Sequence, residues 1–412
     1  MEFERAMTDC GAPLYVLPMP HAQSVATGIL VNAGTRDENW PKQAGLAHAF
    51  EHMAFHGNPK FRTSADVTAF VEEVGGGSNA FTGKELTFFF NVVPTAHALR
   101  GPVNLYHLLS EPLFKQEKIL TEMQNIVEEI KMNHDSPELL VDIIFNEAIY
   151  GDHPLGRCEL GDIESVSAFT RDDLAEYHEK FYHPGNFTFL VVGNIEAAMA
   201  LDSFNALFKK TGHKNSNVRP EGRAIRGGQN KRYVRKDIEQ VHLCLGGAIG
   251  PANSRSTMAL ELFKSMIDGG MSFPLFQEVR DKLGLCYDIR ADITPWSDHG
   301  IVTIYAGTDR KRWRETVQAI LEVLKDSAND EALFRKAKQL VVGRTALKFE
   351  SPTGIIQHAA FATAFRGKPQ SPKEIINEIE GISFEEVASA VGRYLRSEDL
   401  VQTFVGPKDF EP

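Results

Sequence analysis

One sequence pattern occurs twice in the chain and limits the folds that it can adopt. The stretches 174–193 and 387–406 each show a helix-forming segment, then a run of apolar β-formers, then a glycine. Matching residues keep one spacing throughout, since Val387 lies 213 residues after Leu174 and Gly406 lies 213 residues after Gly193. Self-similarity at a fixed offset indicates duplicated units. We therefore predict two homologous halves, in a chain whose 412 residues suffice for about two to three domains.

The patterns inside the halves favour an α+β fold. Apolar and β-branched runs bounded by Pro and Gly predict strands at 13–17, 24–31, 86–93 and 187–192. Helical periodicity predicts helices at about 64–74 and over most of 96–148. Strands mixed with pairs of helices, rather than strict alternation, favour α+β over a doubly wound sheet.

The stretch 209–236 interrupts these patterns. It contains Gly, Asn and Pro together with many Lys and Arg residues, and we interpret it as a linker. Its basic character could indicate a nucleic-acid patch, but with Tyr233 as the single aromatic residue a solvated hinge is favoured. The linker leaves an N-terminal half at 1–208 and a C-terminal half at 237–412.

A His-x-x-Glu-His sequence in the first half supplies candidate chemistry. His48 and His52 are four residues apart, so on a helix both imidazoles lie on one face and can bind one metal ion. Glu51 lies beside them and can take a proton from water without being a ligand. This spacing is typical of zinc hydrolases, which use three protein ligands and an open fourth position. The competing interpretation is a set of incidental polar residues on a surface helix.

A second helix offers the third ligand. In the stretch 114–130, apolar residues recur at helical spacing and define a buried stripe. Glu122 and Glu129 project within about 20° of each other on the flank of this stripe, whereas Glu128 points to the opposite side. We predict Glu129 as the ligand and Glu122 as a carboxylate that orients the site. Two ordinary solvated glutamates are the alternative.

Composition restricts the classes of partner and compartment. The net charge of −11 argues against nucleic acid, and no apolar run is long enough for a membrane helix. The charge could attract basic peptides, although a solvated acidic surface is the simpler explanation. The first residues lack the features of a signal or transit peptide, so we expect a cytoplasmic protein. The four cysteines show no C-x-x-C spacing and suggest neither a disulfide framework nor a cysteine zinc site.

The sequence resembles the insulinase/pitrilysin family of zinc metallopeptidases, in the short, single-half branch related to the mitochondrial processing peptidase. Six ordered motifs carry this resemblance nearly from end to end: His48-x-x-Glu51-His52-Met53-x-Phe55-x-Gly57, Gly75-Gly76-x-x-Asn79-Ala80-x-Thr82, Glu122-x6-Glu129-Ile130, His153-Pro154-Leu155-Gly156-Arg157-x-x-Leu160-Gly161, Tyr182-x-Pro184-x-Asn186 and Arg280-Asp281-x-x-Gly284-Leu285-x-Tyr287. The chain departs from the family pattern at Ala49, Asn58 and Phe273-Pro274. None of these departures removes a proposed ligand.

The resemblance implies a fold and further site residues. Each half should be an α/β roll, a mostly antiparallel sheet with helices packed on one face. The loop containing Asn79 and Ala80 should bind a substrate that pairs with it as an added edge strand. Arg280 and Tyr287 should reach the scissile peptide and stabilise its oxyanion, although Gly284 between them suggests a helix end.

The resemblance also implies an activity and an assembly. The chain should be a zinc endopeptidase with one Zn²⁺ per chain, acting on unstructured peptides inside a closed chamber. One chain supplies only half of such a chamber, so we expect a homodimer, or a heterodimer with a homologous subunit. The competing hypothesis is a catalytically silent family member that binds peptides or serves as a structural subunit.

Overall fold

The computed structural model describes residues 2–209 and 231–412, which form two compact units. The described residues of the first unit come from the ranges 1–130, 158–220 and 346–374. Those of the second unit come from the ranges 131–157, 221–345 and 375–412. Each unit therefore contains one segment from the other half of the sequence. The predicted division into 1–208 and 237–412 does not include this exchange of segments.

The first unit is built on a six-stranded sheet. Its strands are β1 (Glu4–Met7), β2 (Pro13–Pro18), β3 (Ser24–Val31), β4 (Gly77–Thr82), β5 (Thr87–Pro94) and β6 (Phe187–Gly193). They follow the spatial order β1-β2-β6-β3-β5-β4, and β2 with β6 is the one parallel pair. β4 is an edge strand, because within the described residues its second side pairs with no other strand.

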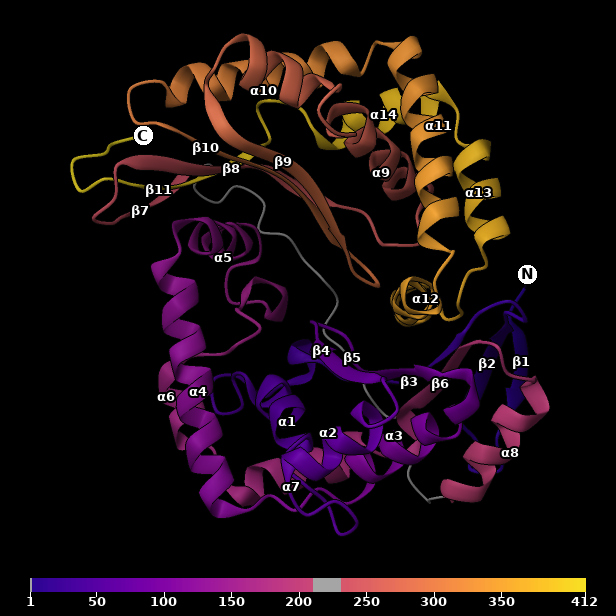
Figure 1. Cartoon of the computed structure of the whole chain (residues 1–412). Coiled ribbons are helices and arrows are strands. Elements are labelled where there is room, and N and C mark those ends of the chain that lie inside the picture. The colour runs from indigo at the N-terminus through magenta and orange to yellow at the C-terminus, as the bar shows by residue number, and fades with distance from the viewer. Residues whose placement is uncertain (1, 210–230) are drawn as a thin grey trace. The chain divides into compact units, whose positions relative to one another are not determined.

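Helices cover both faces of this sheet (Figure 1). They are α1 (Leu46–Ala54), α2 (Ser64–Glu72), α3 (Arg100–Ser110), the first part of α4 (Gln116–Asp135), α6 (Ile163–Ala168), α7 (Arg171–Phe181), α8 (Ala197–Leu207) and α12 (Pro352–Arg366), with short 3-10 turns at Thr35–Asp37, Thr95–His97 and Pro184–Asn186. Gly101 of α3 packs on Thr27, whereas Ile356 of α12 packs on the adjacent Gly28. Neighbouring strand residues face opposite sides, so α3 and α12 lie on opposite faces.

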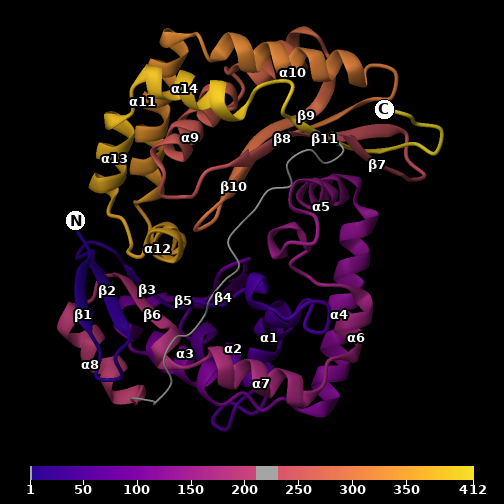
Figure 2. The same ribbon diagram turned by 180° about the vertical axis from the view of Figure 1, so that it is seen from behind.

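The second unit has a five-stranded sheet. Its strands are β7 (Lys231–Arg235), β8 (Gln240–Ile249), β9 (Cys286–Pro295), β10 (Gly300–Asp309) and β11 (Val401–Gly406). Its helices are the end of α4, α5 (Pro137–Tyr150), α9 (Arg255–Ile267), a π-helix at Leu275–Lys282, α10 (Trp313–Ser327), most of α11 (Glu331–Lys348) and of α13 (Pro372–Gly381), and α14 (Phe384–Tyr394), with a 3-10 turn at Pro154–Gly156. α5 packs on one face, where Thr403 hydrogen-bonds to Val141, and α10 packs on the other, where Trp313 meets Phe404 (Figure 2).

The two sheets share one topology, as the repeat predicts. The second follows the order β7-β11-β8-β10-β9, which matches β2-β6-β3-β5-β4 of the first strand by strand. The first pair in each series is parallel and the others are antiparallel. The repeated sequence forms α7 followed by β6 in one unit and α14 followed by β11 in the other. The predicted α+β class with mostly antiparallel sheets is confirmed.

Two features differ from the sequence-based expectation. Each sheet carries a helix on its second face, α12 in the first unit and α5 in the second, and both come from the other half of the sequence. The predicted linker is too long at its end, because Lys231–Arg235 forms β7 and pairs with β11. Residues 210–230 of that linker lie outside the described residues. None of the helices that the structure describes combines the length and apolar composition needed to cross a membrane.

Candidate metal centre

Helix α1 presents the His-x-x-Glu-His sequence from a buried base. Leu46, Phe50 and Met53 follow helical spacing and are almost completely buried in the core of the first unit. This packing fixes which side of α1 faces away from the core. That side of the helix carries His48, Glu51 and His52, which are all partly buried.

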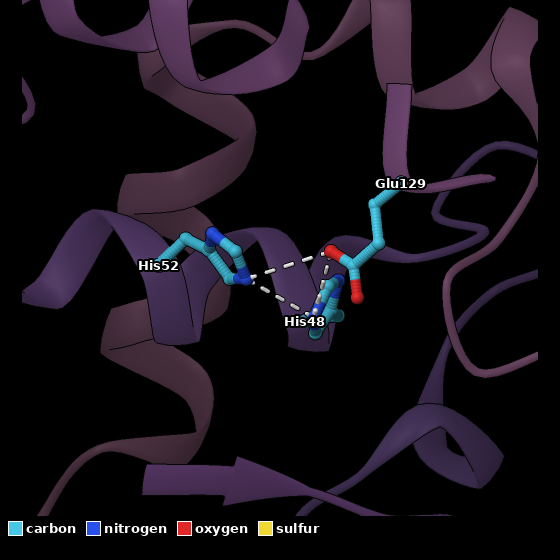
Figure 3. Close-up of side chains that lie close together, drawn as sticks. All are labelled: His48, His52 and Glu129. Carbon is cyan, nitrogen blue, oxygen red and sulfur yellow. Dashed lines mark hydrogen bonds and ion pairs between the residues drawn. The ribbon is translucent and has the colours of Figure 1, made fainter. Parts of the chain in front are cut away.

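Two imidazoles and one carboxylate converge (Figure 3). The Nε2 atoms of His48 and His52 are 3.1 Å apart. Oε2 of Glu129, on α4, lies 3.9 Å from Nε2 of His48 and 4.0 Å from Nε2 of His52. Among the described residues this is the one group of three or more His, Cys, Asp or Glu side chains with ligand atoms this close together. Glu128, the neighbour of Glu129, is exposed and is not part of the group.

The donor set fits zinc. Two imidazole nitrogens and one carboxylate are a known ligand set of catalytic zinc, and in a tetrahedral site such atoms lie about 3.3 Å apart. The two imidazole nitrogens already have nearly this separation, and Glu129 lies on the third side. His48 and His52 point the same nitrogen, Nε2, at one place, as two ligands of one ion must. The three side chains are 12%, 29% and 35% exposed, so the site is accessible from solvent.

Glu122 orients His52. Its Oε1 lies 2.8 Å from Nδ1 of His52, and its Oε2 lies 2.8 Å from Nε2 of His56. Asn125 donates a further hydrogen bond to Oε2. Nδ1 of His52 is therefore the donor, which leaves the lone pair of Nε2 free for a metal. The predicted orienting role of Glu122 matches this geometry.

The environment sets the charge of these groups. Hydrogen bonds from His52 and His56 hold the pKa of Glu122 far below its ordinary range. Burial, reinforced by the nearby His52, lowers the pKa of His48 to about 4, so His48 is neutral near pH 7. Burial also disfavours the charged form of His52, but the hydrogen bond and charge of Glu122 outweigh it and raise its pKa. A metal that binds Nε2 of His52 would compete with the proton that this nitrogen carries in the charged form of the ring.

Glu51 is outside the ligand cluster and is held by a strand. Its Oε2 accepts a hydrogen bond of 2.5 Å from the hydroxyl of Thr82, the last residue of β4. Burial raises the pKa of Glu51, against the opposing effect of the Thr82 hydrogen bond. A carboxylate with a raised pKa, one residue from a ligand, is suited to accept a proton from water. The hydrogen bond also couples this carboxylate to the edge of the sheet.

The predicted substrate-binding residues lie on that edge. Asn79 and Ala80 belong to β4, so the segment expected to be a loop is a strand. The strand forms through pairing with β5, a contact that the local sequence does not reveal. Asn79 is exposed, and its side-chain oxygen accepts a hydrogen bond from the backbone N–H of Ala80. A free strand edge can accept an extended peptide through backbone hydrogen bonds.

Arg280 and Tyr287 belong to the second unit and contact each other. Arg280 lies in the π-helix and stacks over the rings of Phe276 and Tyr287, at 4.7 and 4.5 Å from their centroids. The helix ends before Gly284, which has a φ of +56°, and Tyr287 is the second residue of β9, with 78% of its surface exposed. The predicted helix end at Gly284 is confirmed. A combined action with the zinc ligands stays a prediction.

Sequence reasoning missed two contacts of the site. The sequence motif that contains Thr82 assigns it no role, although its hydroxyl donates a hydrogen bond to Glu51, the proposed base. His56 forms a hydrogen bond with Glu122, the carboxylate that also binds His52. The spacing of His56 one turn after His52 was the available signal. No local signal pointed from Thr82 to Glu51, because their contact forms between a strand and a helix.

Comparisons with known proteins match both halves of the chain. The family model described as Insulinase (Peptidase family M16) matches residues 16–162, which contain the two histidines, Glu51 and Glu129. A second model, described as Peptidase M16 inactive domain, matches residues 168–341. Together the two models cover most of the chain.

Relatives match over almost their whole length. An uncharacterized zinc protease of Bacillus subtilis, YmxG, is 30% identical over 95% of this chain and 95% of its own. An uncharacterized zinc protease of Rickettsia felis is 30% identical over 97% and 96%. Among solved structures, a protease from Helicobacter pylori has a TM-score of 0.90 at 20% identity, covering 98% of this chain and 99% of its own. A peptidase M16 inactive domain from Pseudomonas fluorescens has a TM-score of 0.89 at 18% identity, with both chains fully covered.

Proposed function

Because the chain belongs to the insulinase family (peptidase family M16), we propose that it is a zinc-dependent endopeptidase that hydrolyses unstructured peptides. The observation that carries the proposal is the convergence of His48, His52 and Glu129 beside a carboxylate, Glu51, that stays outside the ligand set. The proposal is also supported by relatives of the chain that are named zinc proteases.

The side chains of the first unit can perform the hydrolysis. His48, His52 and Glu129 would hold the ion, and Glu122 keeps the His52 ring in the tautomer that leaves Nε2 free. A zinc ion in this place would polarise the peptide carbonyl and lower the pKa of water to about 7. Glu51 takes the proton of the water whose oxygen attacks the carbonyl carbon, and it returns that proton to the leaving amine as the C–N bond breaks.

Strand β4 and the pair Arg280 and Tyr287 are candidates for substrate binding. We assign the edge of β4 that no described strand occupies, with Asn79 and Ala80, to main-chain pairing with an extended peptide, which would bring the peptide backbone beside Thr82 and Glu51. Arg280 and Tyr287 would stabilise the oxyanion through a guanidinium and a phenol. Pairing through the main chain demands little sequence preference but does require an unfolded segment.

We further propose that two chains form the enzyme. A homodimer, or a heterodimer with a homologous subunit, would enclose the peptide in a chamber, and each zinc site would use Arg280 and Tyr287 of the partner chain. The competing function is a peptide-binding or structural subunit without activity, which has no need for a base or a ligand cluster. This chain retains His48, His52, Glu129 and Glu51.

The proposal is tested by metal analysis and hydrolysis on the same preparation. We expect about one zinc per chain, cleavage of a mixed peptide library detected by mass spectrometry, loss of cleavage after chelation, and recovery when zinc is restored. A protein without zinc that cuts no peptide would instead support the inactive subunit. Metal-independent cleavage would contradict the assigned chemistry.

A further inference from the structure

The helix that carries both histidines begins without a side-chain cap. Gly45 occupies the N-cap position of α1 and forms no side-chain hydrogen bond. Its φ is +87°, and a Cβ there would lie 2.3 Å from the backbone oxygen of Leu160, so the position requires glycine. The N–H groups of a first helical turn have no partners inside the helix. At the start of α1, acceptors must therefore come from elsewhere in the chain.

Glu38 supplies two of these acceptors, while the backbone oxygen of Gln43 accepts the N–H of Leu46. Oε2 of Glu38 accepts a hydrogen bond of 3.0 Å from the N–H of Gly45, and its Oε1 accepts one of 2.8 Å from the N–H of Ala47, the residue before His48. The side chain is buried, with 8% of the residue exposed. Two hydrogen bonds to the two oxygens of one buried side chain restrict both the position and the rotation of the first turn, whose N–H groups need acceptors.

The segment that carries Glu38 is anchored to the turn between β4 and β5. The N–H of Thr35 binds the oxygen of Gly83 at 3.1 Å, and the N–H of Arg36 binds the oxygen of Lys84 at 2.8 Å. Arg36 also forms a buried ion pair with Glu85. The same turn follows Thr82, which binds Glu51. Glu38 thus connects the ligand helix to the framework that holds the base.

We propose that Glu38 is a positioning residue for the metal centre, whose carboxyl group holds the first turn of α1 so that Nε2 of His48 and Nε2 of His52 point toward Glu129. The inference rests on the proposed function in that the ion is zinc. It assigns Glu38 no contact with the ion or with substrate. Loss of Glu38 should move the ligands and weaken zinc binding beyond what a general loss of stability explains.

Zinc affinity of the metal-free protein tests this role. The dissociation constant is measured by competition with a chromogenic chelator, and the free energy of unfolding is measured by urea on the same samples. We compare Glu38→Gln, which keeps one acceptor oxygen, and Glu38→Asp, which keeps the carboxyl group on a shorter side chain. Both should bind zinc at least about 10-fold more weakly than the wild type, the usual effect of losing a group behind the ligands.

Thr63→Ala is the matched control. Thr63 caps α2 in the same unit, and its hydroxyl accepts a hydrogen bond from the N–H of Asp66. The control should lose unfolding free energy and retain wild-type zinc affinity. Unchanged zinc affinity in both Glu38 variants would overturn the proposal, as would an equal loss in Thr63→Ala at equal stability. A wild type that binds zinc but cuts no peptide would contradict the peptidase and leave the comparison valid, whereas a wild type that binds no zinc would overturn both.

Discussion

Single side chains divide the chemistry of the site between metal binding and proton transfer. Burial keeps His48 neutral, and the hydrogen bond to Glu122 makes Nδ1 of His52 the donor, so that Nε2 of His52 can offer its lone pair to a metal. Glu51 lies one residue from His52, yet Thr82 holds its carboxylate. This division lets neighbouring residues of one helix act as ligand and as base.

Glu38 gives a testable pH dependence. Burial raises its pKa from 4.5 to about 8, against hydrogen bonds from Ala47 and Gly45 and the charge of Lys84, which lower it, while Asp37 raises it. Between these two pH values the folded state binds a proton that the unfolded state does not, so this group makes stability fall as pH rises. The contribution is fully present below pH 4.5 and is lost as pH approaches 8.

The measurement is the free energy of unfolding of the metal-free protein between pH 5 and 8. The wild type should lose stability with rising pH relative to Glu38→Gln, by up to about 1.4 kcal/mol per pH unit, the limit for one proton. Parallel pH curves for the two proteins would show that Glu38 does not titrate in this range.

In helix α4 the buried stripe determines which glutamate faces the histidines. Ile119, Met123, Ile126 and Ile130 are buried in the core of the first unit, and this stripe fixes the rotation of the helix. Glu129 then points to the histidines, and Glu128 is exposed. The choice between the two adjacent glutamates depends on helical rotation alone.

Paired variants test this choice. Glu129→Gln should weaken zinc retention severely, by at least about 10-fold, because it removes a charged ligand, whereas Glu128→Gln should retain wild-type zinc content. Zinc content after dialysis against a weak chelator measures the difference. The opposite order would place the ligand one residue earlier on α4.

Local patterns predicted the elements that bury a regular stripe. The bounds of β3 agree with the strand expected at 24–31, and the ligand set was predicted from helical spacing on α1 and α4. β4 was missed because a glycine-rich segment becomes a strand only through its pairing with β5. The contacts of Thr82 and Glu38 with α1 were missed for the same reason. They depend on tertiary structure and leave no periodic signal.

At the scale of the whole molecule, two sheets of one topology divide the proposed chemistry between them. The ligands and Glu51 belong to the first unit, and Arg280 and Tyr287 belong to the second. The family resemblance predicts that these groups combine between two chains. A two-fold dimer would then contain two equivalent sites, each built from both chains.

Complementation tests this arrangement. Homodimers of Glu51→Gln and of Arg280→Ala should both be nearly inactive. After random subunit exchange about half of the dimers are mixed, and each mixed dimer holds one intact site, so activity should recover to about a quarter of the wild type. If exchange is verified by mass spectrometry and activity stays at the level of the parents, Arg280 does not act across the dimer.

The most direct measurement of the central claim compares zinc content and peptide turnover in Glu51→Gln and the wild type, with Glu128→Gln as a control. If Glu51 is the base and not a ligand, the variant should retain its zinc and its affinity for peptide. Its kcat should fall by at least about 100-fold, and the control should remain active. Near-wild-type turnover in a zinc-loaded Glu51→Gln would contradict the account, and loss of zinc from this variant would show that Glu51 is part of the ligand set.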